Sequence, residues 1–351
     1  MRLRGDEDGH EGLRSGAPGR HPRPSRSVCD EDPLTTLSST SGGCVSDVAA
    51  VDGVYQAIEE SAQLVNATGS GDKLRSILTA YQDVLAQAGI VFTVQTGERN
   101  AGELDYTISF ASGCDDPYGV AVAHGFVVPT GHPVDNLLSD LRDRYPISEY
   151  MIDCGVAGGF KKVYAHFPLE LRTVRELTDI PSMPPALAAN ADLLARHGFH
   201  EVAMIAIDYR RRTMNAYFTR LSPASLDPAS IRSFLREIGL PEPDEALVEF
   251  AARSFRVNVT IGWDTPGIMR VCFAPAPGRG LLAAAPPAIT DRLGPHIEKF
   301  VRNAPHSYGG ASINLFGVKW TPEGECLDVA SYYQASPLMR KMWMAFYKEE
   351  L

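Results

Sequence analysis

Short segments in which apolar and polar residues alternate recur through most of this chain, and a period of two is typical of β-strands. In residues 211–218 one face is apolar, and the other face carries Arg211, Thr213, Asn215 and Tyr217. In residues 160–167 the polar face carries Lys162, Tyr164 and His166. Basic, amide, hydroxyl and aromatic groups therefore share the polar faces of two predicted strands.

The same mixture returns in two segments nearer the C-terminal end. In residues 255–261 an apolar face that begins with Phe255 opposes a face made of Arg256, Asn258 and Thr260, and in residues 269–273 the basic residue is Arg270. Such alternation most often belongs to a sheet with one face in water. A closed barrel whose polar interior binds an anion is the second interpretation.

Helical periodicity and strand alternation follow one another in a regular order along the chain. Helices are predicted over 45–65, 72–88, 134–144, 185–197, 228–239, 245–253 and 289–303. Strands are predicted over 90–96, 104–110, 149–155, 160–167, 201–209, 211–218, 254–263, 267–273, 312–320 and 326–333. Short turns such as 263–267 and 321–325 join the strands in pairs, which indicates antiparallel hairpins.

This order predicts an α+β fold built from five helix–helix–hairpin units of roughly fifty to sixty residues each. About ten strands, each with one apolar face, suggest a closed antiparallel barrel surrounded by a ring of helices. The apolar faces would then pack against the helices, and the polar faces would line the interior. A barrel of this size is wide enough to hold a ligand.

Composition and charge limit the partners of the chain. Of its 351 residues 44% are hydrophobic and 22% are charged, as in globular proteins. A net charge of -10 argues against a nucleic-acid partner, and the absence of a long apolar run argues against a membrane partner. Residues 1–45 lack hydrophobic periodicity, so we expect a disordered N-terminal arm before a single domain over 46–351.

The six cysteines form no C-x-x-C pair, so we interpret them as free thiols in a reducing cytoplasm. We also expect the protein to be a monomer.

The predicted interior has more bases than acids. The same alternation places Lys162, Arg211, Arg256 and Arg270 there, but of the acids only Asp105 and Asp328. Because unpaired buried cations are costly, such a site calls for an anionic ligand. An organic diphosphate fits, with Mg²⁺ bridged to it by one carboxylate. The phosphate-loop and dinucleotide motifs are missing, so we do not expect a nucleotide.

Several of these segments carry a family resemblance that extends from about Val48 to the C-terminal end. The matching stretches are Gly102–Tyr106, Thr130–Asp135, Gly158–Lys162, Ile180–Pro185, Asp208–Arg211, Arg253–Phe255 and Tyr332–Tyr333. In them the chain resembles the aromatic prenyltransferases of the ABBA fold, a ten-stranded barrel ringed by helices. It looks most like the hydroxynaphthalene branch of that family, found in naphterpin biosynthesis.

The resemblance implies transfer of a dimethylallyl or geranyl group from its diphosphate to an electron-rich phenol, hydroxynaphthalene or naphthoquinone in secondary metabolism. It places Asp105 at the Mg²⁺ position of the family. It places Lys162, Arg211, Thr213, Asn215 and Arg270 on the diphosphate. It places Tyr164, Tyr217, Phe255 and Tyr332 around the allyl chain and the acceptor, where the three tyrosines can stabilise a carbocation. Phe92, Met204 and Met339 are expected to set the depth of the pocket.

The chain departs from the pattern of this branch at three positions. Asp328 stands where the branch has a diphosphate-binding lysine, Asn258 where it has a diphosphate-binding tyrosine, and Arg256 where it has a small hydroxyl residue beside the acceptor. Our hypothesis is that Arg256 pairs with Asp328 and takes over phosphate binding. The departures also lead us to expect that Mg²⁺ stimulates the reaction without being strictly required.

Two other classes of function were weighed against the enzyme. One is a non-catalytic barrel that binds or carries an anionic isoprenoid-like ligand, and the other is a structural or partner-binding protein. The loss of Lys162 or Arg211 would favour a carrier, but both are present. A structural protein leaves the basic and aromatic inward positions unexplained, so the prenyltransferase is the leading hypothesis.

Overall fold

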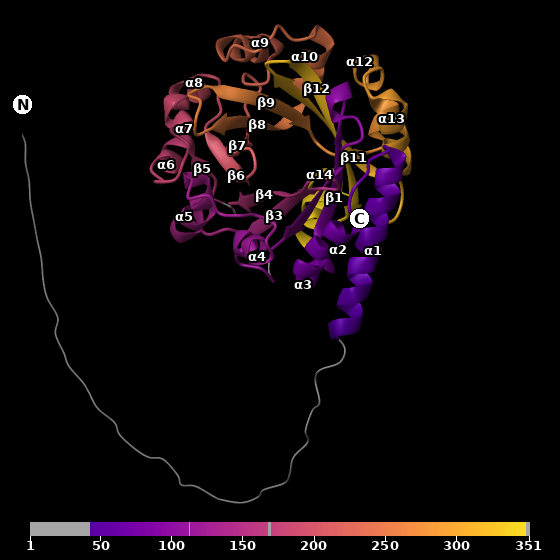
Figure 1. Cartoon of the computed structure of the whole chain (residues 1–351). Helices are drawn as coiled ribbons and strands as arrows, with labels where there is room; N and C mark the ends of the chain where they lie inside the picture. The colour runs from indigo at the N-terminus through magenta and orange to yellow at the C-terminus, as the bar shows by residue number, and fades with distance from the viewer. Residues whose placement is uncertain (1–42, 112, 168–169, 349–351) are drawn as a thin grey trace, which may run out of the picture. The chain divides into compact units, whose positions relative to one another are not determined.

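The computed structural model describes residues 43–111, 113–167 and 170–348 (Figure 1). These residues belong to one compact unit, Ser41–Leu351. Most of the expected arm, residues 1–42, lies outside the described residues. The first helix, α1 (Gly43–Leu64), begins two residues before the predicted start.

Ten antiparallel strands form a closed ring, as the alternation predicted. Their order is β11-β12-β1-β2-β3-β4-β6-β7-β8-β9, and pairing of β9 with β11 through Phe273 and Val318 closes the ring. Closure leaves these strands without a free sheet edge. The strands are β1 (Gly89–Gln95), β2 (Asp105–Phe110), β3 (Glu149–Gly155), β4 (Gly159–His166), β6 (Glu201–Asp208), β7 (Thr213–Phe218), β8 (Ser254–Gly262), β9 (Ile268–Pro275), β11 (Ile313–Thr321) and β12 (Gly324–Gln334). Two short strands, β5 (Arg172–Thr173) and β10 (Gly278–Arg279), pair with β6 and β11.

Helices surround the ring, as Figure 1 shows from α1 round to α13. After α1 they are α2 (Gly71–Ala80), α3 (Gln82–Leu85), α4 (Pro117–Ala123), α5 (Leu137–Arg144), α6 (Val174–Thr178), α7 (Pro185–Ala189), α8 (Ala191–Arg196), α9 (Pro228–Glu237), α10 (Glu245–Ala251), α11 (Leu281–Ala284), α12 (Pro287–Thr290), α13 (Gly294–Asn303) and α14 (Pro337–Tyr347). Two 3₁₀ turns lie at Glu98–Asn100 and Pro133–Asp135.

Some helices differ from the prediction. The predicted helix over 72–88 is divided into α2 and α3 at Tyr81, that over 185–197 into α7 and α8 at Asn190, and that over 289–303 into α12 and α13. The sequence did not lead us to expect α4, α6, α11 or α14. The stretch Asp115–Pro117 has the composition of a turn, but it starts α4 because Asp116 accepts a hydrogen bond from the backbone N–H of Gly119.

The main hydrophobic core lies between the outer face of the ring and the helices. Phe92, Phe218, Phe273 and Trp320 are among its largest fully buried side chains. Two much smaller apolar clusters lie elsewhere, one around Met204 and Tyr217 and the other around Ala274, Leu315 and Ala330. The period of two in the sequence thus separates an outer core from an inner face that is available for a ligand.

Five register shifts interrupt the pairing of these strands, and three of them are β-bulges that bear on the interior. At each of the three an extra residue on one strand has no partner on the next: Lys161 on β4, Ala203 on β6 and Phe255 on β8. A bulge re-aims the side chain at the extra position. All three residues line interior cavities beside their neighbours Lys162, Met204 and Arg256. The alternation had assigned Phe255 to the outward face, and the bulge is the reason that this assignment is wrong.

No helix in the described ranges is long and apolar enough to cross a membrane. Cys114, Cys154, Cys272 and Cys326 are free thiols, as expected for these four; Cys29 lies outside the described residues.

Candidate functional site

A polar cavity of about 570 Å³ occupies one part of the barrel interior. Its basic side chains are Lys161, Lys162, Arg210, Arg211, Arg270 and Lys319, and its acidic side chains are Glu103, Asp105, Asp153, Asp208 and Asp328. Arg211, Arg270 and Lys319 also line a wider hollow that is bordered by the β8–β9 and β11–β12 hairpins. The cavity is therefore continuous with one mouth of the barrel.

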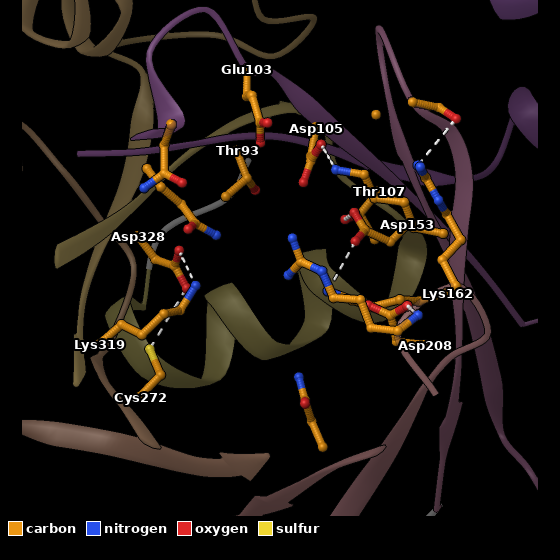
Figure 2. Close-up of a pocket in the computed structure, with 18 of the residues that line it drawn as sticks. Thr93, Glu103, Asp105, Thr107, Asp153, Lys162, Asp208, Cys272, Lys319 and Asp328 are labelled. Atoms are coloured by element: carbon orange, nitrogen blue, oxygen red, sulfur yellow. Dashed lines mark hydrogen bonds and ion pairs between the residues drawn. The ribbon is translucent and has the colours of Figure 1, made fainter. Parts of the chain in front are cut away.

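The lysines of this cavity are held in ion pairs with aspartates from other strands of the ring (Figure 2). Lys162 Nζ lies 3.3 Å from Asp153 Oδ2, and Lys319 Nζ lies 2.7 Å from Asp328 Oδ1. Lys161 pairs with Asp105. In Figure 2 the Lys319–Asp328 pair lies on the opposite side of the cavity from Asp105, Asp153 and Lys162. Each side of the cavity therefore already holds a lysine in contact with a carboxylate before a ligand arrives.

The excess of bases is smaller than the sequence suggested. Six bases against five acids leave one positive charge, whereas alternation had predicted four bases against two acids. The prediction missed Asp153, Asp208 and Lys319, although each has the inward parity of its strand. It missed Lys161 because the bulge on β4 breaks the parity there. An anionic ligand is still favoured, but the margin of charge is narrow.

Two of the acidic and basic side chains of the cavity have shifted pKa values. Burial alone would lower the pKa of Lys162, but the Asp153 carboxylate, followed by Tyr217 and Asp208, holds it above its usual value. Lys162 is therefore a permanent cation. Burial and then the nearby Asp153 carboxylate raise the pKa of Asp105, against the effect of Lys161. Additional positive charge near Asp105 would relieve this unfavourable ionisation.

A chain of hydrogen bonds orients Arg270. Its Nε donates to Thr260 Oγ1 over 2.9 Å, and the Thr260 hydroxyl donates to Asn215 Oδ1 over 2.8 Å. The amide of Asn215 then donates to the hydroxyl of Tyr217 over 3.5 Å. Since Thr260 engages Nε, the terminal nitrogens of Arg270 remain for a ligand in the cavity.

A second, apolar cavity of about 190 Å³ adjoins the first, and Tyr217 lines both. Its wall includes Met204, Phe255, Tyr308 and Tyr332, and α14 contributes Leu338, Met339, Met342, Trp343 and Tyr347. One acidic residue, one histidine and one arginine also line this cavity: Glu149, His166 and Arg256. The interior therefore changes along its length from a charged compartment to an aromatic and aliphatic one beneath α14.

Most of the candidate residues line these spaces. Asp105, Lys162, Tyr164, Arg211, Asn215, Tyr217, Asn258 and Arg270 line the polar cavity, and Met204, Phe255, Arg256 and Tyr332 line the apolar one. Thr213 lines the hollow at the mouth, where its Oγ1 is buried without a hydrogen-bond partner among the described residues. Met339 lines the apolar cavity.

Phe92 is placed differently from our expectation. Its side chain is fully buried in the outer core and stacks on Tyr333 with ring centroids 5.6 Å apart. Phe92 shares the outward parity of Ile90 and Val94 on β1, while Val91 packs with Phe255 and Tyr332 in an inner cluster. The residue that faces inward here is therefore Val91, and Phe92 does not set the depth of either cavity.

The expected pair between Arg256 and Asp328 is wrong. Asp328 forms its ion pair with Lys319. The strands β11 and β12 are neighbours, and in their register Asp328 lies opposite Gly317, two residues from Lys319 on the same face. Arg256 lies instead at the apolar cavity. Lys319 on β11 therefore lies beside Asp328, the position on β12 at which the resemblance places a lysine. The inward parity of Lys319 was the signal in the sequence that could have revealed it.

The potential nucleophiles of the interior are neutral. Burial holds the pKa of Tyr164 well above its usual value, and burial also raises the pKa of Tyr332. Burial and the Asp328 carboxylate raise the pKa of the Cys272 thiol to about 12. Since a thiolate is the reactive form of cysteine, an electrophile in this cavity meets neutral groups and the faces of tyrosine rings.

Comparison with known proteins places this barrel in a defined class. The family described as "Aromatic prenyltransferase Orf2" matches residues 49–340. A 5,10-dihydrophenazine-1-carboxylate 9-dimethylallyltransferase of Streptomyces anulatus is 38% identical over 86% of this chain and 99% of its own length. A flaviolin linalyltransferase of Streptomyces virginiae is 36% identical over 83% of this chain and 94% of its own length. A furaquinocin biosynthesis prenyltransferase of Streptomyces sp. (strain KO-3988) is 38% identical over 82% of this chain and 92% of its own length.

The chain belongs to this family of aromatic prenyltransferases. The protein is accordingly a prenyltransferase of the α+β barrel class, as the resemblance implied, and the carrier and structural alternatives are set aside.

Proposed function

We propose that an allylic diphosphate binds with its diphosphate in the polar cavity and its allyl chain toward Tyr217, while an aromatic acceptor occupies the apolar cavity. One observation carries this assignment: a compartment with six basic side chains meets an apolar compartment at a shared tyrosine. An allylic diphosphate has the same division into a charged head and an apolar tail. Lys162, Arg211, Asn215 and Arg270 would bind the diphosphate, with Thr213 at the mouth.

The reaction we propose is electrophilic aromatic substitution. The bond between the allylic carbon and the diphosphate oxygen breaks, and both electrons leave with the diphosphate. An aromatic ring carbon of the acceptor donates a π-electron pair to the allylic cation, which forms the new carbon–carbon bond. The same ring carbon then loses its proton, so the products are the prenylated arene, diphosphate and one proton.

The described residues favour this ionisation in two ways. Preoriented cations stabilise the charge that develops on the leaving oxygens, and removal of one such donor typically costs about 10²–10³ in rate. The rings of Tyr164 and Tyr217, whose centroids lie 6.0 Å apart, can stabilise the allylic cation by about 0.5–2 kcal/mol each. Since both rings act through their π density, neither phenol needs to act as a nucleophile. Tyr332 offers a third ring on the acceptor side.

Mg²⁺ fits the carboxylates near Asp105. Asp105 and Asp153 lie on adjacent strands, and the charge of Asp153 raises the pKa of Asp105. A divalent cation between them and the diphosphate would relieve this repulsion, and one or two carboxylates plus phosphate oxygens are usual Mg²⁺ ligands. When bound, the ion would neutralise charge on the leaving group. Because Lys161 already pairs with Asp105, we expect stimulation by Mg²⁺ and no absolute requirement.

For the acceptor we propose an electron-rich bicyclic phenol or hydroxynaphthoquinone, with a dimethylallyl or geranyl donor. The relatives named for flaviolin and for furaquinocin biosynthesis support this class. The small volume of the apolar cavity, about 190 Å³, supports a compact flat molecule. Met204 and Met339, both at this cavity, would adjust its depth because methionine side chains adapt their shape readily.

The test is a matrix of donors and acceptors with a mass readout. Purified protein is incubated with dimethylallyl, geranyl and farnesyl diphosphate against a panel of dihydroxynaphthalenes and hydroxynaphthoic acids, with Mg²⁺ or with EDTA. We expect a mass gain of one prenyl group with at least one C5 or C10 donor. If the protein releases diphosphate but no acceptor gains mass, the assignment of the apolar cavity to an aromatic acceptor is wrong.

A cytoplasmic location and a monomeric state stay predictions. The free thiols of the described chain fit a reducing compartment, and light scattering on the purified protein measures the oligomeric state.

A further inference from the structure

Arg256 is an unpaired cation at an otherwise mostly apolar cavity. Its Nε is buried without a hydrogen-bond partner among the described residues. Its guanidinium carbon lies 5.3 Å from the ring centre of Tyr217 and 5.4 Å from that of Phe255. Contacts with ring faces compensate a buried guanidinium by only about 0.5–2 kcal/mol. An anionic partner is therefore missing from its surroundings.

The acidic residue of the apolar cavity does not supply this partner. Glu149 lies opposite His166 on the neighbouring strand, with its Oε2 3.8 Å from His166 Nδ1. Its Oε1 is buried without a hydrogen-bond partner among the described residues, as is His166 Nδ1. No carboxylate of the described chain pairs with Arg256, so Glu149 and Arg256 each retain a free polar atom at the same cavity.

The diphosphate of the donor is also unsuited to be this partner. Arg256 does not line the polar cavity, where six other basic side chains are gathered. A diphosphate at Arg256 would leave those residues and enter a surface made of Met204, Phe255, Tyr332 and α14. The anion at Arg256 must therefore belong to the molecule in the apolar cavity.

We propose that Arg256 binds a carboxylate on the aromatic acceptor, so that this enzyme prefers aryl carboxylic acids to the corresponding neutral phenols. The inference rests on the proposed function of the apolar cavity. The planar guanidinium matches two carboxylate oxygens, and its two terminal nitrogens can form such a bidentate contact. A hydroxyl or ring N–H of the same acceptor can donate to Glu149 Oε1. The acceptor class is then an aromatic acid with a hydrogen-bond donor elsewhere on the ring system.

The experiment compares two acceptors that differ only by the carboxyl group: a dihydroxynaphthoic acid and the dihydroxynaphthalene with the same hydroxyl positions. For the wild-type protein we expect kcat/KM at least about tenfold higher for the acid, since hydrogen bonds to a charged group are worth roughly that or more. Arg256→Leu should lower kcat/KM for the acid about 10- to 100-fold more than for the neutral compound. The KM of the donor diphosphate should not rise. Arg256→Lys should retain part of the preference.

A control removes an arginine of the outer surface. Arg302 on α13 is exposed and pairs with Glu298 within the helix. Arg302→Leu should therefore leave kcat/KM unchanged for both acceptors. Thermal unfolding checks that Arg256→Leu folds; if it does not, Arg256→Lys and Arg256→Gln carry the same comparison.

Binding separates this inference from the proposed function. Calorimetry with unreactive geranyl thiolodiphosphate present measures the affinity for each naphthalene without turnover. If no acceptor is prenylated but the acid binds more tightly than its neutral analogue and loses that advantage in Arg256→Leu, the proposed function fails and the carboxylate site stands. Equal binding and equal turnover of the two compounds by the wild-type protein would overturn the carboxylate site, whatever the donor.

Discussion

The polar and apolar cavities meet at Tyr217 but hold their charges differently. In the polar cavity Lys161, Lys162 and Lys319 are each paired with an aspartate. In the apolar cavity Glu149, His166 and Arg256 each have a buried polar atom without a hydrogen-bond partner among the described residues. Paired charges can preorganise a site without a ligand, whereas unpaired ones lower stability until a ligand arrives.

The proposed function assigns a different part of the specificity to each compartment. In that proposal the polar cavity binds the diphosphate head that is common to every prenyl donor, so its charges can be fixed in advance by ion pairs between strands. The apolar cavity binds the acceptor, and its free polar atoms would recognise substituents that differ between acceptors. The relatives, whose names include a phenazine carboxylate and flaviolin, differ in the acceptor or in the prenyl group transferred.

The largest effect is expected from removing a cation that is deeply buried in the polar cavity, Lys162. Lys162→Met should lower kcat/KM for the donor about 10²–10³-fold, because one preoriented charge on the leaving group is lost. The variant leaves Asp153 buried without its lysine, so the protein could also lose stability. The double variant Lys162→Met with Asp153→Asn removes this cost. Full activity in the double variant, measured with the donor varied, would contradict a role on the diphosphate.

The Lys319–Asp328 pair should be the next most sensitive. Lys319→Met leaves Asp328 facing the diphosphate without its cation, so the donor KM should rise about tenfold or more. The exchange Lys319→Asp with Asp328→Lys keeps both charges on the same side of the cavity, at β11 and β12, and should recover most of the affinity. Steady-state kinetics of the two variants measures the KM of the donor. If the exchanged pair has as high a KM as Lys319→Met, the donor site depends on the position of this cation and not on its charge alone.

A smaller effect is expected at Asp105. When EDTA removes Mg²⁺, the turnover of the wild-type protein should fall by a factor of several and by no more than about ten. The fall is limited because Lys161 already supplies one positive charge beside Asp105. Asp105→Asn should have the same rate with and without Mg²⁺. Turnover of the wild-type protein that is unaltered in EDTA would show that Asp105 has only a structural role.

The smallest effect is expected on the free energy of unfolding, at Glu149, the acidic residue of the apolar cavity. Burial raises the pKa of Glu149 from 4.5 to about 6, so the folded protein disfavours its ionised form. Stability is therefore lost as pH rises from about 4.5 to about 6, and the loss is complete above that range. Glu149→Gln should be more stable than wild type at pH 7.5 by up to about 2 kcal/mol, and the gain should vanish below about pH 4.5.

Chemical denaturation across this pH range measures the difference between the two proteins. Glu298→Gln on the exposed surface of α13 is the matched control, and it should change stability by less than about 0.5 kcal/mol. A gain for Glu149→Gln that persists at pH 4 would mean that relief of charge is not its cause.

Much of the architecture could be predicted because it follows from local chemistry. Alternation at β3 located the strand with its observed bounds, Glu149–Gly155. At β7 the apolar face, Met214, Ala216 and Phe218, is buried in the outer core, as the pattern implied. Two of the helices that were missed, α4 and α6, are short and begin at specific caps: at α6, Thr173 and Glu176 form a capping box. The closed ring itself needed a contact between β9 and β11 that no local pattern specifies.

By itself the sequence determined which residues have an inward parity, because side chains alternate along every extended strand. That was sufficient to place Lys162, Arg270 and Tyr217 in one interior. Only the tertiary structure decided where the parity breaks, which acid pairs with which base, and which inward residues share a cavity. Lys161 and Phe255 point inward because the pairing of adjacent strands forces a bulge, Asp328 meets Lys319 because β11 and β12 are neighbours, and Arg256 lies at the apolar cavity because that cavity is completed by α14. These are long-range contacts, and their geometry depends on the register and closure of the whole ring.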